Sequence, residues 1–159
     1  MENKKLSDWA SIAEVVSAVA IVLSLLYVGY QIRENTIEVR ATNRQELISR
    51  AMSATENSAS REISEVLTKA FDGSDLTAVE RTQFGYIVRT VLYDVQEAYL
   101  LHAEGRLDEA YWNTRASIVL QYLGPTVARA IYHRDSSIGA LHPDFVSWLD
   151  NALDERYGK

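Results

Sequence analysis

The chain has 159 residues and no cysteine. The absence of cysteine excludes disulfides, thiolate metal sites and cysteine catalysis. Its formal net charge of −6 argues against nucleic acid as a partner, because backbone phosphates are bound by basic surfaces. About 125 residues follow the first apolar segment, which is enough for one domain with its own core.

The first predicted element is an apolar helix long enough to cross a membrane. From Val15 to Ile32 the chain has no Asp, Glu, Lys, Arg, His or Pro, which is typical of a transmembrane helix. A central core helix of a soluble bundle is the alternative. A cleaved signal peptide fits less well, because the run exceeds the usual apolar region of ~7 to 15 residues and no Ala-x-Ala site follows it.

The length of the segment and its aromatic residues also favour a membrane span. A helix from Trp9 to Tyr30 rises about 31 Å, close to the ~30 Å hydrocarbon core of a bilayer. Trp9 at one end, and Tyr27 with Tyr30 at the other, suit the two membrane interfaces, where such rings are enriched. We therefore predict a tail at 1–8, a transmembrane helix at 9–32 and a lipid bilayer around it.

Small residues recur at alternating steps of three and four in this helix and form one line along it, here called the seam. The seam comprises Ala10, Ala13, Ser17, Ala20 and Ser24, and Tyr27 and Gln31 prolong it. Small side chains let two helix backbones approach closely in lipid. The seam predicts a homo-oligomer or a larger membrane complex; the alternative is that Ala and Ser are merely tolerated among Val, Ile and Leu.

One acidic residue, Glu14, lies beside the seam. A charge at the bilayer centre costs about 2.5 to 3.5 kcal/mol, and less near the edge. Glu14 can therefore reach the nearby interface, make a hydrogen bond between associating helices, or face a proton or cation pathway in an oligomer. We predict that it belongs to the association surface.

Basic residues near the two ends of the span predict its orientation. Lys4 and Lys5 precede it, whereas Arg33, Arg40 and Arg44 follow it. Because basic residues are retained on the cytoplasmic side, the small excess after the span predicts a single-pass protein with its C-terminal domain in the cytoplasm.

The span is expected to continue as a stalk helix over 33–56, since no Gly or Pro occurs between Ile32 and Gly73. Part of the stalk approximates a heptad line, formed by Ile37, Ala41, Ile48 and Met52 and interrupted by Arg44 and Gln45. The stalk can associate with itself, pack on the following domain, or remain a solvated connector.

Residues 60–159 are predicted to form a small helical bundle. The first helix has an apolar stripe and ends at Asp72-Gly73. The next begins with Thr77 and Glu80, a capping-box pair, and ends near Gly105. Its apolar stripe is the strongest in the chain and predicts the central core helix, through Phe84, Ile87, Val88, Val91, Leu92, Val95, Ala98 and Tyr99.

Three further helices are expected. Asp108 can cap one that ends at Gly124-Pro125, Thr126 starts a short one that ends near Arg134, and Pro143 suits the first turn of the last. No strand pattern competes, so the predicted class is all-α.

No catalytic, cofactor-binding or metal-binding residue is predicted. The chain has no His-Glu-x-x-His, Gly-x-Ser-x-Gly, phosphate-loop or dinucleotide motif, and no Glu is followed three residues later by His. His133 and His142, with Asp135 and Asp144, have no recognisable ligand spacing, and His102 continues the apolar stripe. The aromatic residues of the C-terminal half are expected to fill the core, with a groove for a partner helix or lipid tail as the alternative.

Three segments resemble a large, uncharacterised group of small bacterial membrane-anchored proteins. They are Ser-Leu-Leu-Tyr-Val-Gly-Tyr-Gln-Ile-Arg-Glu-Asn-Thr at 24–36, Leu-Asp-Glu-Ala-Tyr-Trp at 107–112 and His-Pro-Asp-Phe-Val at 142–146. The resemblance implies a helical fold and a location in the bacterial membrane, and it transfers no catalytic activity to this chain.

Together these patterns predict a non-enzymatic, membrane-anchored interaction or scaffold protein, or an accessory subunit of a membrane assembly. The alternatives are an oligomer that conducts protons or ions through Glu14 and a ligand-sensing helical domain.

Overall fold

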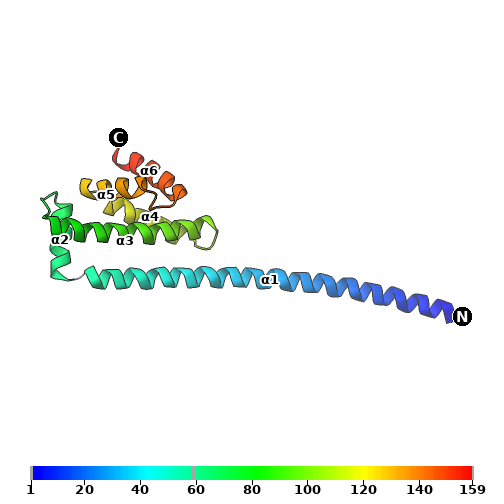
Figure 1. The fold of residues 1–159 in the computed structure, drawn as a ribbon. Coiled ribbons are helices and arrows are strands. Elements are labelled where there is room, and N and C mark those ends of the chain that lie inside the picture. The colour runs from blue at the N-terminus through cyan, green and yellow to red at the C-terminus, as the bar shows by residue number, and fades with distance from the viewer. Residues whose placement is uncertain (1, 59, 159) are drawn as a thin grey trace. The chain divides into compact units, whose positions relative to one another are not determined.

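The computed structural model describes residues 2–58 and 60–158, with side chains for 9, 13–53, 55, 56 and 60–158. In this part of the chain every regular element is a helix (Figure 1). The elements are α1 (Glu2–Ser58), α2 (Arg61–Phe71), α3 (Ala78–Ala103), α4 (Glu109–Tyr122), α5 (Thr126–Ser137) and α6 (Pro143–Tyr157). The predicted all-α class, a long N-terminal helix followed by a small bundle, is confirmed.

The chain divides into two compact units, Met1–Val39 and Arg40–Lys159, and α1 contributes to both. One segment of α1 is long and apolar enough to cross a membrane. The second unit begins well before residue 60, where the sequence places the start of the bundle, because side chains of the last part of α1 pack against the other helices.

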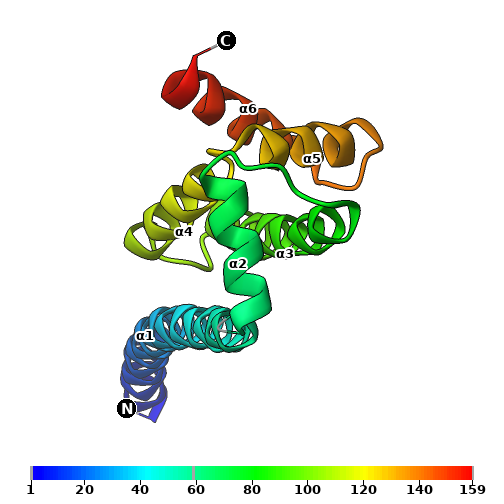
Figure 2. The ribbon, with the colours of Figure 1, turned by 90° about the vertical axis from the view of Figure 1, so that its left-hand side faces the viewer.

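The second unit is built around α3, which contacts α2, α4, α5 and α6. Two views show α5 and α6 on one side of α3 and residues 40–58 of α1 on the other (Figure 1, Figure 2). The buried residues of α3 are Phe84, Gly85, Val88, Leu92, Val95 and Ala98. The predicted role of this segment as the central core helix is confirmed, although the predicted stripe also included Ile87, Val91 and Tyr99, which are half-buried.

The start of α3 has the predicted capping box. The hydroxyl of Thr77 accepts a hydrogen bond from the Glu80 amide at 3.2 Å, and the Glu80 carboxylate accepts one from the Thr77 amide at 2.8 Å. Lys69 of α2 also forms an ion pair with Glu80. The Lys69 and Thr77 hydrogen bonds lower the pKa of Glu80 from 4.5 to about 2.

The lowered pKa makes the contribution of Glu80 depend on pH. Because the carboxylate is favoured in the folded chain, its stabilisation is fully present above pH 4.5 and disappears as the pH falls toward about 2. We expect Glu80→Gln to lower the melting temperature at pH 6 and to converge with the parent chain near pH 2. Thermal unfolding of both chains across this range tests the prediction, and a pH-independent difference would contradict it.

The other predicted helix starts are also found. The Asp108 carboxylate accepts a hydrogen bond from the Tyr111 amide at 2.9 Å at the start of α4, and Pro143 occupies the first turn of α6. The sequence did not indicate that the ring of His142 would cap α6, where its Nδ1 accepts a hydrogen bond from the Asp144 amide at 3.3 Å. Helix α5 continues to Ser137, past the predicted end at Arg134.

Candidate functional site

The apolar segment of α1 exposes its side chains on every face. All side chains from 13 to 38 are exposed, including Ala13, Ser17, Ala20 and Ser24 of the seam. The side chain of Ala10, also predicted for the seam, lies outside the described residues. Large apolar side chains are exposed together with them, among them Val15, Ile21, Leu25, Leu26 and Ile32. A helix that is apolar all round is typical of a membrane span or a protein core.

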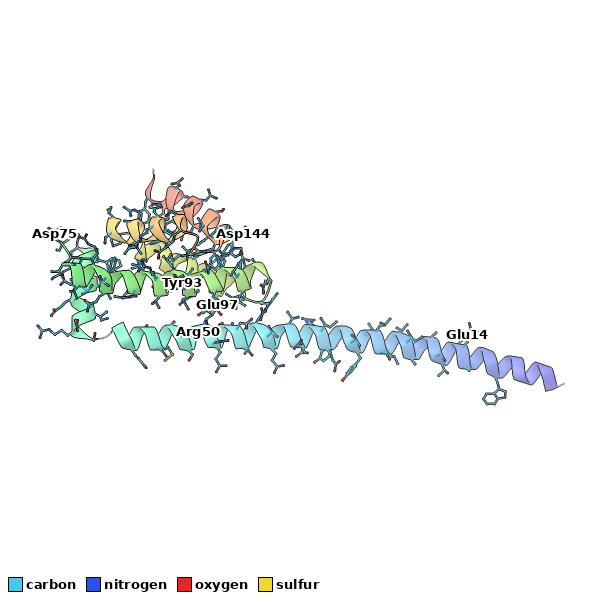
Figure 3. All side chains as sticks on the ribbon, viewed as in Figure 1. Glu14, Arg50, Asp75, Tyr93, Glu97 and Asp144 are labelled. Carbon is cyan, nitrogen blue, oxygen red and sulfur yellow. The ribbon has the colours of Figure 1, made fainter. Side chains whose placement is uncertain are left out.

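The residues predicted at the ends of the span are exposed as well. Trp9, Tyr27 and Tyr30 all have most of their surface exposed, and the Tyr27 hydroxyl accepts a hydrogen bond from the Gln31 amide nitrogen at 3.1 Å. Glu14 is exposed near the N-terminal end of the segment (Figure 3). No hydrogen bond or ion pair joins Glu14 to another described side chain.

The last part of α1 holds the turn between α3 and α4. The Arg40 Nε donates to the Gly105 carbonyl oxygen at 2.9 Å, and the Asn43 amide nitrogen donates to the Arg106 carbonyl oxygen at 3.1 Å. These carbonyl groups lie in the turn beyond the end of α3, where no helix supplies a hydrogen-bond partner, so they favour such donors. Arg44 adds an ion pair with Asp108 at 3.3 Å.

An apolar contact and a second ion pair continue this face of α1. Leu47 is 1% exposed and belongs to the core of the bundle. Arg50 pairs with Glu97 of α3, and the two side chains point toward one another (Figure 3). Residues 40–50 therefore pack on the domain, which was one of the three alternatives for the stalk, and this part of α1 is not a purely solvated connector.

The predicted heptad line lies on a different face of α1 from the one that packs on the bundle. Ile48 is 42% exposed and Met52 is 60% exposed, whereas neighbouring Leu47 is buried. These exposed residues line a shallow, open and mainly apolar groove of about 330 Å³ between α1 and α4. Its lining residues are Ile48, Ala51, Met52, Thr55 and Glu56 of α1 and Tyr111 and Arg115 of α4. The sequence indicated the α1 residues, but no spacing linked them to α4.

Two ion pairs, which the sequence did not indicate, cross the interior of the bundle. Arg115 of α4 pairs with Asp94 of α3, and their side chains are 10% and 17% exposed. Burial lowers the pKa of Arg115, and its Nε atom has no hydrogen-bond partner among the described residues. Arg89 donates to both carboxylate oxygens of Asp135, at 2.6 and 3.0 Å, from the other side of α3. Both pairs join helices of the bundle, so we assign them a structural role.

The described histidines and nearby acids do not gather at one site, although the His142 Nδ1 lies 3.9 Å from a carboxylate oxygen of Asp144. Asp135 is held by Arg89, and His142 caps α6. The His102 ring stacks on Trp112 with 5.7 Å between centroids and 13° between planes. Among the described residues, no group of three or more His, Cys, Asp or Glu side chains could hold a metal ion.

Most aromatic residues of the C-terminal half fill the core. Tyr132, Phe145 and Trp112 are buried, and half-buried Trp148 contacts both Phe145 and Trp112. Tyr132 also donates a hydrogen bond to the Asp150 carboxylate at 2.7 Å. Tyr111 is half-buried against the core and also lines the groove.

Comparison of the chain with protein families, curated proteins and solved structures found no match.

Proposed function

We propose that this chain is a non-enzymatic membrane-anchored interaction or scaffold protein that associates through the seam of its apolar helix. One observation carries the proposal: the side chains of 13–32 are exposed on all faces of α1, with Glu14 as the one charged residue among them. In water, such a surface would favour aggregation, whereas in lipid it needs no cover. The bilayer is therefore the proposed surroundings of this segment.

The proposed location is the bacterial inner membrane, with one span and the bundle in the cytoplasm. The resemblance of 24–36, 107–112 and 142–146 to bacterial membrane-anchored proteins supports the location. The basic residues that follow the span support the orientation. Protease added to sealed inverted vesicles should then digest the bundle, whereas digestion only in vesicles of native orientation would reverse the assignment.

The seam supports association in the membrane. Lipid tails are as apolar as Leu and Val, so helices in a bilayer associate through close packing and hydrogen bonds. Ser17, Ala20 and Ser24 are small enough to let a second backbone approach, and the two serines can also hydrogen-bond across the contact. Glu14 lies beside this line and can accept such a hydrogen bond.

A larger side chain in the seam should weaken the oligomer. We expect Ser17→Leu and Ala20→Leu each to weaken association by about tenfold or more, because Leu separates the helix backbones. Val22→Leu is the control, since it also places a Leu side chain, on the face opposite the seam. Native mass analysis of the full chain, extracted from membranes in mild detergent, measures the oligomer.

Two results would contradict the proposal. A parent chain that remains in the soluble fraction without aggregating has no anchor. A membrane-bound chain that is monomeric, or whose oligomer is equally stable with Leu at residues 17, 20 and 22, does not use the seam.

A further inference from the structure

We infer that the groove between α1 and α4 is a second self-association site, which receives residues 41–55 of α1 from another copy of this chain. The inference rests on the proposed function, because it adds a contact outside the membrane to an association proposed within it. The arguments come from the two faces of α1, the spacing of the exposed residues and the shape of the groove.

Helix α1 has two distinct faces beyond residue 40. One face holds the bundle through Arg40, Asn43, Leu47 and Arg50. The other carries Ala41, Gln45, Ile48, Met52 and Thr55, all of them exposed. These five residues are uncharged, although Arg44, Glu46, Arg50 and Glu56 lie among or beside them in the sequence. Exclusion of charge from an exposed helix stripe is typical of a helix–helix contact.

The spacing of the exposed stripe matches the spacing of the seam. Counted along the sequence, steps of three and four lead from Ser17 through the seam to Gln31, and the same alternation continues from Ala41 to Thr55. A seven-residue repeat of this kind predicts two helices wound around each other. Because a second copy has the same repeat, it is the partner whose register fits.

Two acidic residues separate the seam from the exposed stripe. Glu34 and Glu38 occupy the intervening positions of the repeat. In a parallel pair they would face the same residues of the other copy, and like charges repel. We therefore place the second contact at 41–55, beyond the two acids.

The groove suits side chains of a helix better than a small ligand. It is open and shallow, and its mainly apolar lining includes Met52, whose flexible side chain adapts to irregular contacts. Small-molecule sites are usually enclosed and bury most of their ligand. Once the seam holds two chains together, the groove of one chain meets the other chain at a high effective concentration. A small contact area then suffices for binding at the groove.

Cysteine crosslinking tests the inference, since the chain has no native cysteine. Met52→Cys is introduced into the full chain in its own membranes, with Ser53→Cys as the exposed control off the stripe and Ser17→Cys as a reporter of the seam. Disulfides need Cα atoms about 4.4 to 6.8 Å apart, so they form only at close contacts. We expect several-fold more covalent dimer with Met52→Cys than with Ser53→Cys after mild oxidation.

The variants separate this inference from the proposed function. One outcome is covalent dimer with Ser17→Cys while Met52→Cys and Ser53→Cys give equal yields of dimer. That result would overturn the groove contact and leave the seam in place. Dimer with Met52→Cys but not Ser17→Cys would support the groove and overturn the seam. If the thiol of the Met52→Cys variant is protected from a water-soluble maleimide without any dimer, the groove is covered by lipid or another protein, which overturns the inference. Unchanged melting temperatures show that each variant is folded.

Discussion

Replacing Asp94 by alanine is expected to lower the free energy of unfolding by about 3 to 5 kcal/mol. The change leaves the Arg115 guanidinium charged and largely buried, without the carboxylate that now balances it. Its Nε has no hydrogen-bond partner in the described part of the chain, so the loss of Asp94 would leave the side chain with little compensation for its lost hydration. Chemical unfolding of the full chain in detergent, followed by circular dichroism, measures the loss.

Two controls separate the effect of burial from that of charge. Glu65→Ala removes the partner of Arg61 in an exposed pair and should change the unfolding free energy by less than about 1 kcal/mol. A double replacement, Asp94→Leu with Arg115→Leu, removes both buried charges and should be less destabilising than Asp94→Ala alone. Equal effects of Asp94→Ala and Glu65→Ala would contradict a buried, structural ion pair.

Leu47→Ala is expected to lower the free energy of unfolding by about 2 to 5 kcal/mol, because it removes a fully buried side chain and leaves a cavity. The prediction concerns a residue in the same helix as the proposed membrane span. A large effect would therefore show that residues 40–58 are part of the folded bundle rather than a connector. Chemical unfolding, in a detergent that keeps the chain monomeric, provides the measurement.

Ile48→Ala is the matched control for Leu47→Ala. The two residues are adjacent in α1, but Ile48 is 42% exposed, so its truncation in the monomer should cost about 0.5 kcal/mol or less. If both substitutions had the same small effect, α1 would not pack on the bundle. If Ile48→Ala had the larger effect, the heptad line would be the buried face instead.

The helices of the bundle could be predicted from the sequence because their ends have local signals. Thr77 with Glu80, Asp108 and Pro143 each act within a few residues of their own position, and the apolar residues of α3 recur at helical spacing. Such features need no knowledge of the tertiary fold.

The packing of α1 on the bundle could not be predicted in the same way. A heptad count selected Ile48 and Met52, but the buried residue is Leu47, which lies on the face where Arg40 and Asn43 also contact the turn at 104–108. The ion pairs Asp94–Arg115 and Arg89–Asp135 join residues far apart in the sequence. Periodicity reports which face is apolar, but it does not report which charged side chains meet.

The seam differs from both cases. Its spacing and composition are properties of one helix, so the sequence contains the whole argument, and exposure of Ala13, Ser17, Ala20 and Ser24 leaves the line accessible. Association itself remains a prediction, which the seam variants test.

The contacts of the turn at 104–108 determine where the protein tolerates an epitope tag. Because Arg40 and Asn43 bind backbone carbonyls of this turn, an insertion there would remove these contacts between α1 and the bundle even if every helix still formed. The turn between α5 and α6 offers a safer place, since Ile138 and Gly139 are exposed and Gly139 already has a positive φ of 72°. A fluorophore or affinity sequence placed there would report on the assembled protein without disturbing the contacts between α1 and the turn at 104–108.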